Sequence, residues 1–118
     1  MVLVLSVAGG FALGVPTPDG RTAQLDAYAR DAGTVLAGEP PRHGGATRLD
    51  EVTRSPDAFE READALERRV ERILPDNLLF RVTTPHGSVG FRRPAGVPVG
   101  RATVTTLHGD VRIEVWYT

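Results

Sequence analysis

The stretch SPDAFEREADALERRVERILPDNLLFRVTT, residues 55–84, contains the change of periodicity that decides the fold class. Ser55 is of a type that caps helix N-termini, Pro56 suits the first helical position, and Asp57 complements the positive end of the helix dipole. Apolar residues then recur at steps of four and three until Pro75, which cannot continue a helix. These residues are Phe59, Ala63, Leu66, Val70, Ile73 and Leu74. The stripe is too short for a coiled coil and predicts a helix lying across a sheet.

Beyond Asn77 the spacing changes to the alternation that is typical of half-buried strands. Strands are predicted over 78–84, 88–93, 101–107 and 111–118, with turns at 85–87 and 108–110 and a proline-containing loop at 94–100. In the last strand, one face is expected to hold Val111, Ile113, Val115 and Tyr117, and the other Arg112, Glu114 and Trp116.

Upstream of this stretch, apolar residues at helical spacing predict a helix over 22–37, ended by Gly38 and the Pro40-Pro41 pair. Residues 39–47 have loop composition, and a short helical turn is expected over 48–53. We therefore predict an α+β fold, in which N-terminal helices precede a four-stranded antiparallel β-meander packed against a helix.

The N-terminal segment differs from everything that follows it. Residues 1–15, MVLVLSVAGGFALGV, form one apolar run, and the first ionisable side chain is Asp19, after a break at Pro16 and Pro18. We divide the chain into this segment, 1–15, and a single α+β head domain, 19–118. The segment residues expected to contact lipid or other subunits are Val2, Leu3, Val4, Leu5, Val7, Phe11 and Leu13.

Three interpretations of the apolar segment compete. It could be the apolar core of a signal peptide, although no basic residue precedes it. It could be a helix or strand buried in the head's own core. It could also be the end of a longer membrane helix, since a helix of its length spans about 22 Å against about 30 Å of hydrocarbon. Gly9, Gly10 and Gly14 disfavour a soluble helix but suit membrane or filament helices.

The composition excludes some kinds of chemistry. Cysteine is absent, which excludes disulfides, thiolate metal sites and cysteine nucleophiles. Residues 1–76 hold nine arginines and thirteen acids, whereas residues 77–118 hold five arginines and two acids. This mild asymmetry is typical of complementary packing and a solvated helix face. A nucleic-acid partner is not expected, because the helix that would have to enter a groove is rich in acids that phosphate repels.

No residue pattern indicates catalysis or a cofactor. The three histidines, His43, His86 and His108, each precede a glycine at a predicted turn, and none shares a short ligand spacing with another. We therefore expect surface turn histidines and no metal site. No nucleophile elbow, phosphate-binding glycine loop or Ser-His-acid set is evident. The sequence predicts a protein that is not an enzyme, with no small-molecule substrate identified.

Five stretches carry a resemblance to a known group: FALGVPTPDGRTAQLDAYARDA (11–32), EPPRHGGATRLDEV (39–52), ERRVERILPDNLLFRV (67–82), TPHGSVGFRRP (84–94) and VRIEVWYT (111–118). On these residues the chain resembles haloarchaeal pilin-like proteins encoded beside type IV pilus-like assembly machinery. The resemblance implies an apolar N-terminal helix that anchors the subunit and packs into a filament, with a small head outside the cell. A pilin-type leader has a basic processing site before that helix, so we expect either an internal start at Met1 or an unprocessed copy.

These observations lead to one functional hypothesis and one alternative. The first is a non-catalytic, membrane-anchored structural subunit of an archaeal cell-surface appendage or secretion system, with the membrane and similar subunits as partners. The alternative is a soluble α+β binding or regulatory module in which residues 1–15 are buried in the core.

Overall fold

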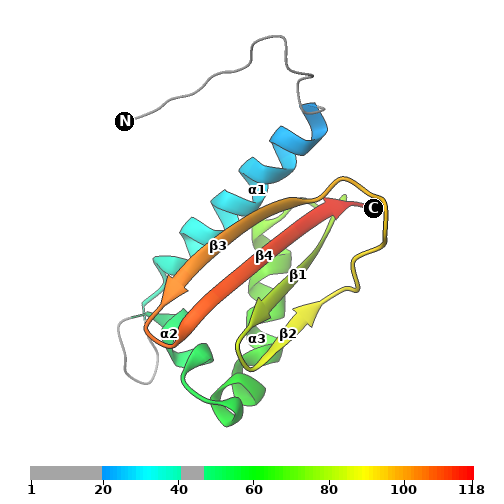
Figure 1. Ribbon diagram of the computed structural model, residues 1–118. Coiled ribbons are helices and arrows are strands. Elements are labelled where there is room, and N and C mark those ends of the chain that lie inside the picture. The colour runs from blue at the N-terminus through cyan, green and yellow to red at the C-terminus, as the bar shows by residue number, and fades with distance from the viewer. Residues whose placement is uncertain (1–19, 41–46) are drawn as a thin grey trace.

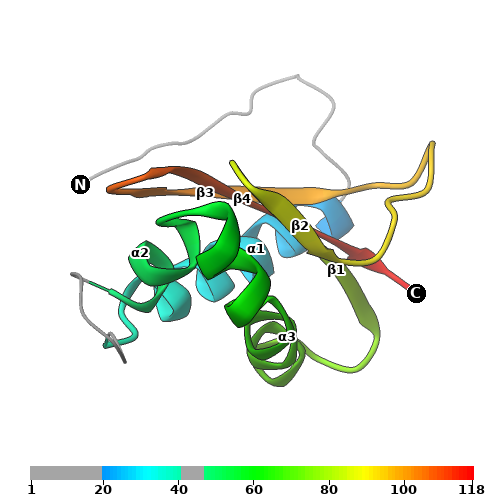
Figure 2. The same ribbon diagram turned by 90° about the horizontal axis from the view of Figure 1, so that it is seen from below.

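The computed structural model describes residues 20–40 and 47–118, and it shows three helices followed by four strands. The helices are α1 (Gly20–Ala37), α2 (Arg48–Thr53) and α3 (Pro56–Ile73). The strands are β1 (Leu78–Thr84), β2 (Gly87–Gly90), β3 (Gly100–Thr106) and β4 (Gly109–Tyr117). The strands form one antiparallel sheet, and the helices lie on one of its faces (Figures 1 and 2). The predicted α+β fold is confirmed.

The order of the strands corrects the predicted meander. The sheet has the order β2-β1-β4-β3, so two hairpins lie side by side with β1 against β4. The physical reason lies in β4, whose residues Ile113 to Trp116 are all buried. In a central position, side chains of the two neighbouring strands flank those of β4 on both faces. In the threonine-rich β3, by contrast, Arg101, Thr103 and Thr105 are exposed, which suits an edge strand.

The polar side of β4 is more buried than alternation alone would indicate. Arg112 is exposed as expected, but Glu114 and Trp116 are buried. The Glu114 carboxylate lies 3.5 Å from Nε of Arg93, in the β2–β3 connection, and 3.3 Å from Nε of Arg101 on β3. Two partly exposed arginines thus surround one buried carboxylate on the face away from the helices, which leaves an excess of positive charge there.

Helix α3 forms as its sequence predicts. The Ser55 hydroxyl accepts a hydrogen bond from the Ala58 N–H at 3.0 Å, and Pro56 occupies the first turn. Phe59, Leu66 and Val70 are buried against the core, whereas Ala63 and Ile73 pack at its margin. The helix therefore owes its position to a cap and an apolar stripe that are both contained in its own sequence.

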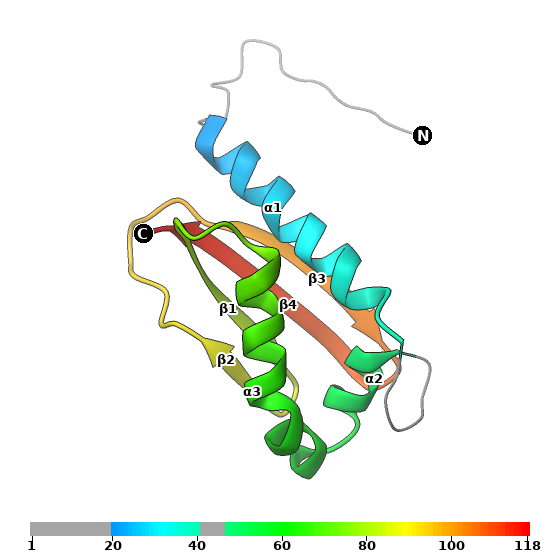
Figure 3. The same ribbon diagram turned by 180° about the vertical axis from the view of Figure 1, so that it is seen from behind.

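Helix α1 packs unusually close to the sheet. Its buried face consists of Leu25, Ala29, Ala32 and Leu36, which include two small residues. A Cβ atom added at Gly100, the first residue of β3, would overlap the backbone of Leu25. The helix and the edge strand are therefore nearly in backbone contact at the end of the molecule where α1 begins (Figure 3).

Candidate functional site

The residues predicted to contact lipid or other subunits lie outside the described part of the chain. These are Val2, Leu3, Val4, Leu5, Val7, Phe11 and Leu13. Between residue 20 and the C-terminus, leaving out 41–46, no helix combines the length and apolar character needed to cross a bilayer.

The two histidines that the structure describes, His86 and His108, both lie in turns between strands. One ring nitrogen of His86, Nε2, lies 3.0 Å from the Thr53 carbonyl oxygen and so ties the β1–β2 turn to α2. His108 is exposed in the β3–β4 turn, and His43 lies outside the described residues. The two turns lie at the same end of the sheet, because a Cβ on Gly109 would meet the Pro85 ring. Even so, within 20–40 and 47–118 no cluster of three His, Cys, Asp or Glu residues could hold a metal ion.

Two ion pairs join α3 to the segments that precede it in the chain. Nε of Arg69 lies 2.8 Å from the Glu39 carboxylate, and Nη2 of Arg48 lies 3.3 Å from that of Glu62. Burial lowers the pKa of the Arg69 guanidinium, although the Glu39 carboxylate opposes this shift. The cluster pairs two acids with two arginines and joins α3 to α2 and to the segment that follows α1. Nε of Arg48 and both Nη atoms of Arg69 are buried without a hydrogen-bond partner among the described residues.

The free edge of β3 is the most distinctive surface of the head. In an extended strand, alternate residues direct their backbone N–H and C=O groups to the same side. Ala102 and Val104 face Ile113 and Val111 of β4 in the paired register. The Arg101 and Leu107 N–H groups bond to side chains outside the sheet, so the alternate residues Arg101, Thr103, Thr105 and Leu107 direct their backbone groups outward.

Two aspartates cap the ends of this edge. At one end, the Arg101 N–H donates to the carboxylate of Asp26 on α1 at 3.0 Å. At the other end, the Leu107 N–H donates to the carboxylate of Asp50 on α2 at 2.9 Å. Between the caps, the N–H groups of Thr103 and Thr105 donate to no group of the described residues. The unpaired edge is therefore short and has defined ends.

Asp50 has a second role in the same corner. Its carboxylate also accepts hydrogen bonds from the N–H and the hydroxyl of Thr47, which completes a capping box at the start of α2. The hydrogen bond from the Leu107 N–H, helped by those from Thr47, lowers the pKa of Asp50 in spite of its burial. The carboxylate is thus held in its charged form while it fixes the β3–β4 turn to α2.

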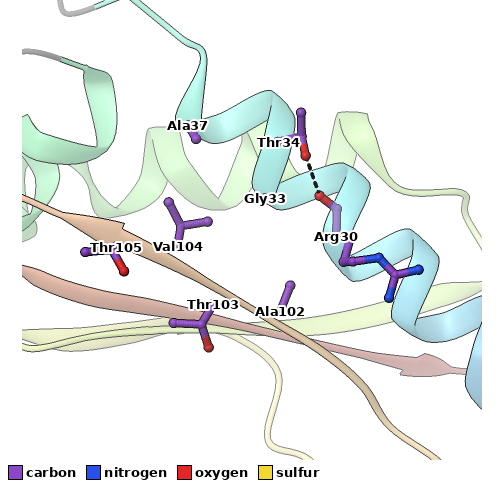
Figure 4. Close-up of a pocket in the computed structure, with 8 residues that line it drawn as sticks. All are labelled: Arg30, Gly33, Thr34, Ala37, Ala102, Thr103, Val104 and Thr105. Atoms are coloured by element: carbon purple, nitrogen blue, oxygen red, sulfur yellow. Dashed lines mark hydrogen bonds between the residues drawn. The ribbon is translucent and has the colours of Figure 1, made fainter. Parts of the chain in front are cut away.

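A cavity of about 380 Å³ opens beside the uncapped part of the edge, between α1 and β3 (Figure 4). Its walls are Arg30, Gly33, Thr34 and Ala37 of α1 and residues 102–105 of β3. A second cavity of about 260 Å³ shares Ala37, Val104 and Thr105 and continues to Leu107. The two hollows together follow the edge from one aspartate cap to the other, and apart from Arg30 and Asp50 their walls are uncharged.

Sequence reasoning did not identify this edge. The T-x-x-D spacing of Thr47 and Asp50 is a recognisable capping signal, but nothing in the sequence shows that the same carboxylate reaches a turn 57 positions away. Asp26 lies in the middle of a helix and gave no signal at all. Both contacts depend on β3 taking the edge position, which only the strand order reveals.

Comparison with known proteins identifies the family to which the chain belongs. The profile of DUF7262, a family of unknown function, matches residues 1–117, so the chain is a member of that family. The match covers both the apolar segment and the head. No curated protein and no solved structure matches the chain.

Proposed function

We propose that this member of the DUF7262 family is a non-catalytic, pilin-like structural subunit, anchored by its apolar N-terminal segment, with the α+β head on the cell surface. The observation that carries the proposal is a contrast within the chain. Residues 1–15 are uniformly apolar and precede the first charged side chain, whereas the head has a charged surface and an apolar core that the described residues line. So long an apolar run gains free energy by leaving water, and we place it in lipid or against other subunits.

The head supports this proposal through the composition of its core. Residues from Leu25 onward bury α1, α2 and α3 against the sheet, and Leu25, Phe80, Val82 and Ile113 are almost fully buried. The chain enters the head at the start of α1, near the end of the molecule where β3 begins.

The described head offers a surface for binding, and its histidines and buried acids already have other contacts. The described histidines contact backbone or solvent, and two of the three buried acids of the described residues, Asp50 and Glu114, form the hydrogen bonds and ion pairs given above. This arrangement favours an assembly role, with an enzyme or a soluble binding module as the competing classes.

The test compares the full chain with a variant that lacks residues 1–15. We expect the full chain to sediment with membranes and to require detergent for release. The truncated chain should stay in the soluble fraction with the same thermal unfolding transition as the full chain in detergent. A chain carrying Leu3→Asp and Leu5→Asp should behave like the truncation, whereas the control pair Asn77→Asp and Thr118→Asp, both exposed, should leave membrane binding unchanged.

Two results would contradict the proposal. If the truncated chain does not fold, residues 1–15 belong to the core of the head, and the proposed membrane anchor is wrong. If the full chain stays soluble without detergent, the alternative of a soluble binding or regulatory module is favoured.

A further inference from the structure

We infer that the free edge of β3 is a docking site for one extended, uncharged segment of a partner protein, which adds to the sheet as a fifth strand. The inference concerns the head alone and goes beyond membrane anchoring, so it stands or falls separately from the proposed function.

The first argument is the hydrogen-bonding capacity of the edge. Unpaired backbone groups along an edge strand form a template for another strand. Here the outward N–H groups of Thr103 and Thr105 are unused by the described residues, while those of Arg101 and Leu107 are satisfied by Asp26 and Asp50. The two caps limit the template to the central residues, so an added strand pairs over about five residues.

The second argument is that residues 102–106 of the edge strand carry none of the protective features that edge strands usually have in their own sequence. Edge strands are commonly blunted by charged side chains, proline or a bulge. Residues 102–106 are Ala, Thr, Val, Thr and Thr, which contain no charge and no proline, and their register with β4 is unbroken. Three threonines and a valine also have high strand propensity.

The third argument is the space beside the edge. Alternate side chains of an added strand point toward the helical layer, where the cavity between α1 and β3 lies. Gly33, Ala37, Ala102 and Val104 line that cavity with hydrogen or methyl groups, which favours small β-branched or aliphatic side chains (Figure 4). Arg30 is the one charged residue of this lining, so the walls favour an occupant that is uncharged along its pairing residues.

The partner strand is not β3 of a second copy paired antiparallel, with the helices of both copies on the same face. Helix α1 packs on β3 over most of its length, and a helix is about 10 Å wide, whereas paired strands are about 4.8 Å apart. Two copies joined edge to edge would bring their α1 helices into overlap. The occupant must therefore arrive without a helix above it, as an extended segment.

The test follows amide hydrogen exchange of the full-length protein in detergent, with and without the blocked peptide acetyl-TVTVTVT-amide. Without the peptide, the Thr103 and Thr105 amides should exchange much faster than those of Ala102 and Val104, which are paired to β4. A saturating peptide should slow exchange at Thr103 and Thr105 at least tenfold. The control peptide acetyl-TPTPTPT-amide, in which proline replaces each valine and removes its N–H donor, should have no effect.

Two protein variants locate the binding. Thr105→Pro removes one edge donor and should abolish the protection at Thr103, while Thr105→Val keeps the backbone and should retain it. Should the proline variant unfold, Ala37→Trp fills the cavity from the exposed side of α1 and should weaken peptide binding at least tenfold.

The inference is overturned if neither amide is slowed by acetyl-TVTVTVT-amide, or if acetyl-TPTPTPT-amide protects both amides equally well. It is also overturned if the folded Thr105→Pro variant keeps the protection at Thr103. It is also overturned if the two amides are already protected in the full chain and lose this protection when residues 1–15 are deleted. In that case the chain's own apolar segment, and not a partner, occupies the edge.

Discussion

Helices α1 and α3 have the same length, 18 residues, and cover the same face of the sheet, yet they are held there by different means (Figure 3). Helix α3 has a serine cap, a proline in its first turn, acid near its start and arginine near its end. Helix α1 has no acid in its first turn and no basic residue in its last. Its buried face contains small residues that let the backbone approach β3.

This difference separates local from tertiary stabilisation. The signals that stabilise α3 are contained in its own sequence and would act even in a peptide. Those that stabilise α1 depend on β3, which begins more than sixty positions later in the chain. The edge-strand surface is made by α1 together with β3. The candidate site is therefore built from the helix that has fewer stabilising signals in its own sequence.

The largest expected effect tests the close approach of α1. Gly100→Ala should destabilise the head by about 3 kcal/mol, because the new Cβ overlaps the Leu25 backbone, which cannot rotate away as a side chain can. Urea unfolding measures the change. Gly38→Ala is the control, since its Cβ would make only ordinary contacts and should alter stability by less than about 0.5 kcal/mol. Equal effects at the two glycines would show that α1 does not pack on β3 as described.

An intermediate effect concerns the carboxylate that links α2 to the β3–β4 turn. Asp50→Asn should cost about 1–2 kcal/mol at pH 7, because an amide cannot accept from both the Leu107 and the Thr47 N–H groups with its two ends. The pKa of Asp50 is lowered on folding, so its charge stabilises the head above the unfolded-state pKa of about 4. That stabilisation is lost as the pH falls through the folded-state pKa.

The wild-type protein and Asp50→Asn should therefore differ most near neutral pH and converge in acid, as followed by urea midpoints between pH 2 and 7. Asp110→Asn, at an exposed position, provides the control. A gap between wild type and Asp50→Asn that stays constant down to pH 2 would contradict the role assigned to the charge.

The smallest effect tests the local stabilisation of α3. Ser55→Ala should lower stability by about 1 kcal/mol, because the Ala58 N–H loses its acceptor at the first turn. Ser55→Asp, which restores an acceptor, should recover most of this loss. Thermal unfolding is sufficient to rank the stability of the three proteins. An alanine variant as stable as the wild type would show that the Ser55 cap does not stabilise α3.

Much of the fold was determined by the sequence because the signals are local. The limits of α2 and β1 agree with prediction, and the other long elements differ by one or two residues at their ends. Only β2 is clearly shorter than expected, since it ends at Gly90, whose φ of 101° belongs to the left-handed region. The predicted separation of an apolar segment from a charged head also rests on composition alone.

The tertiary structure alone decided the order of the strands and everything that depends on it. Periodicity shows which face of a strand is buried but not which strand it pairs with, because hydrogen bonding between strands involves the backbone that all residues share. The sequence by itself therefore determined the elements of the head and their apolar faces. The edge position of β3, its two aspartate caps and the cavity beside it arose only when residues distant in the chain were brought together.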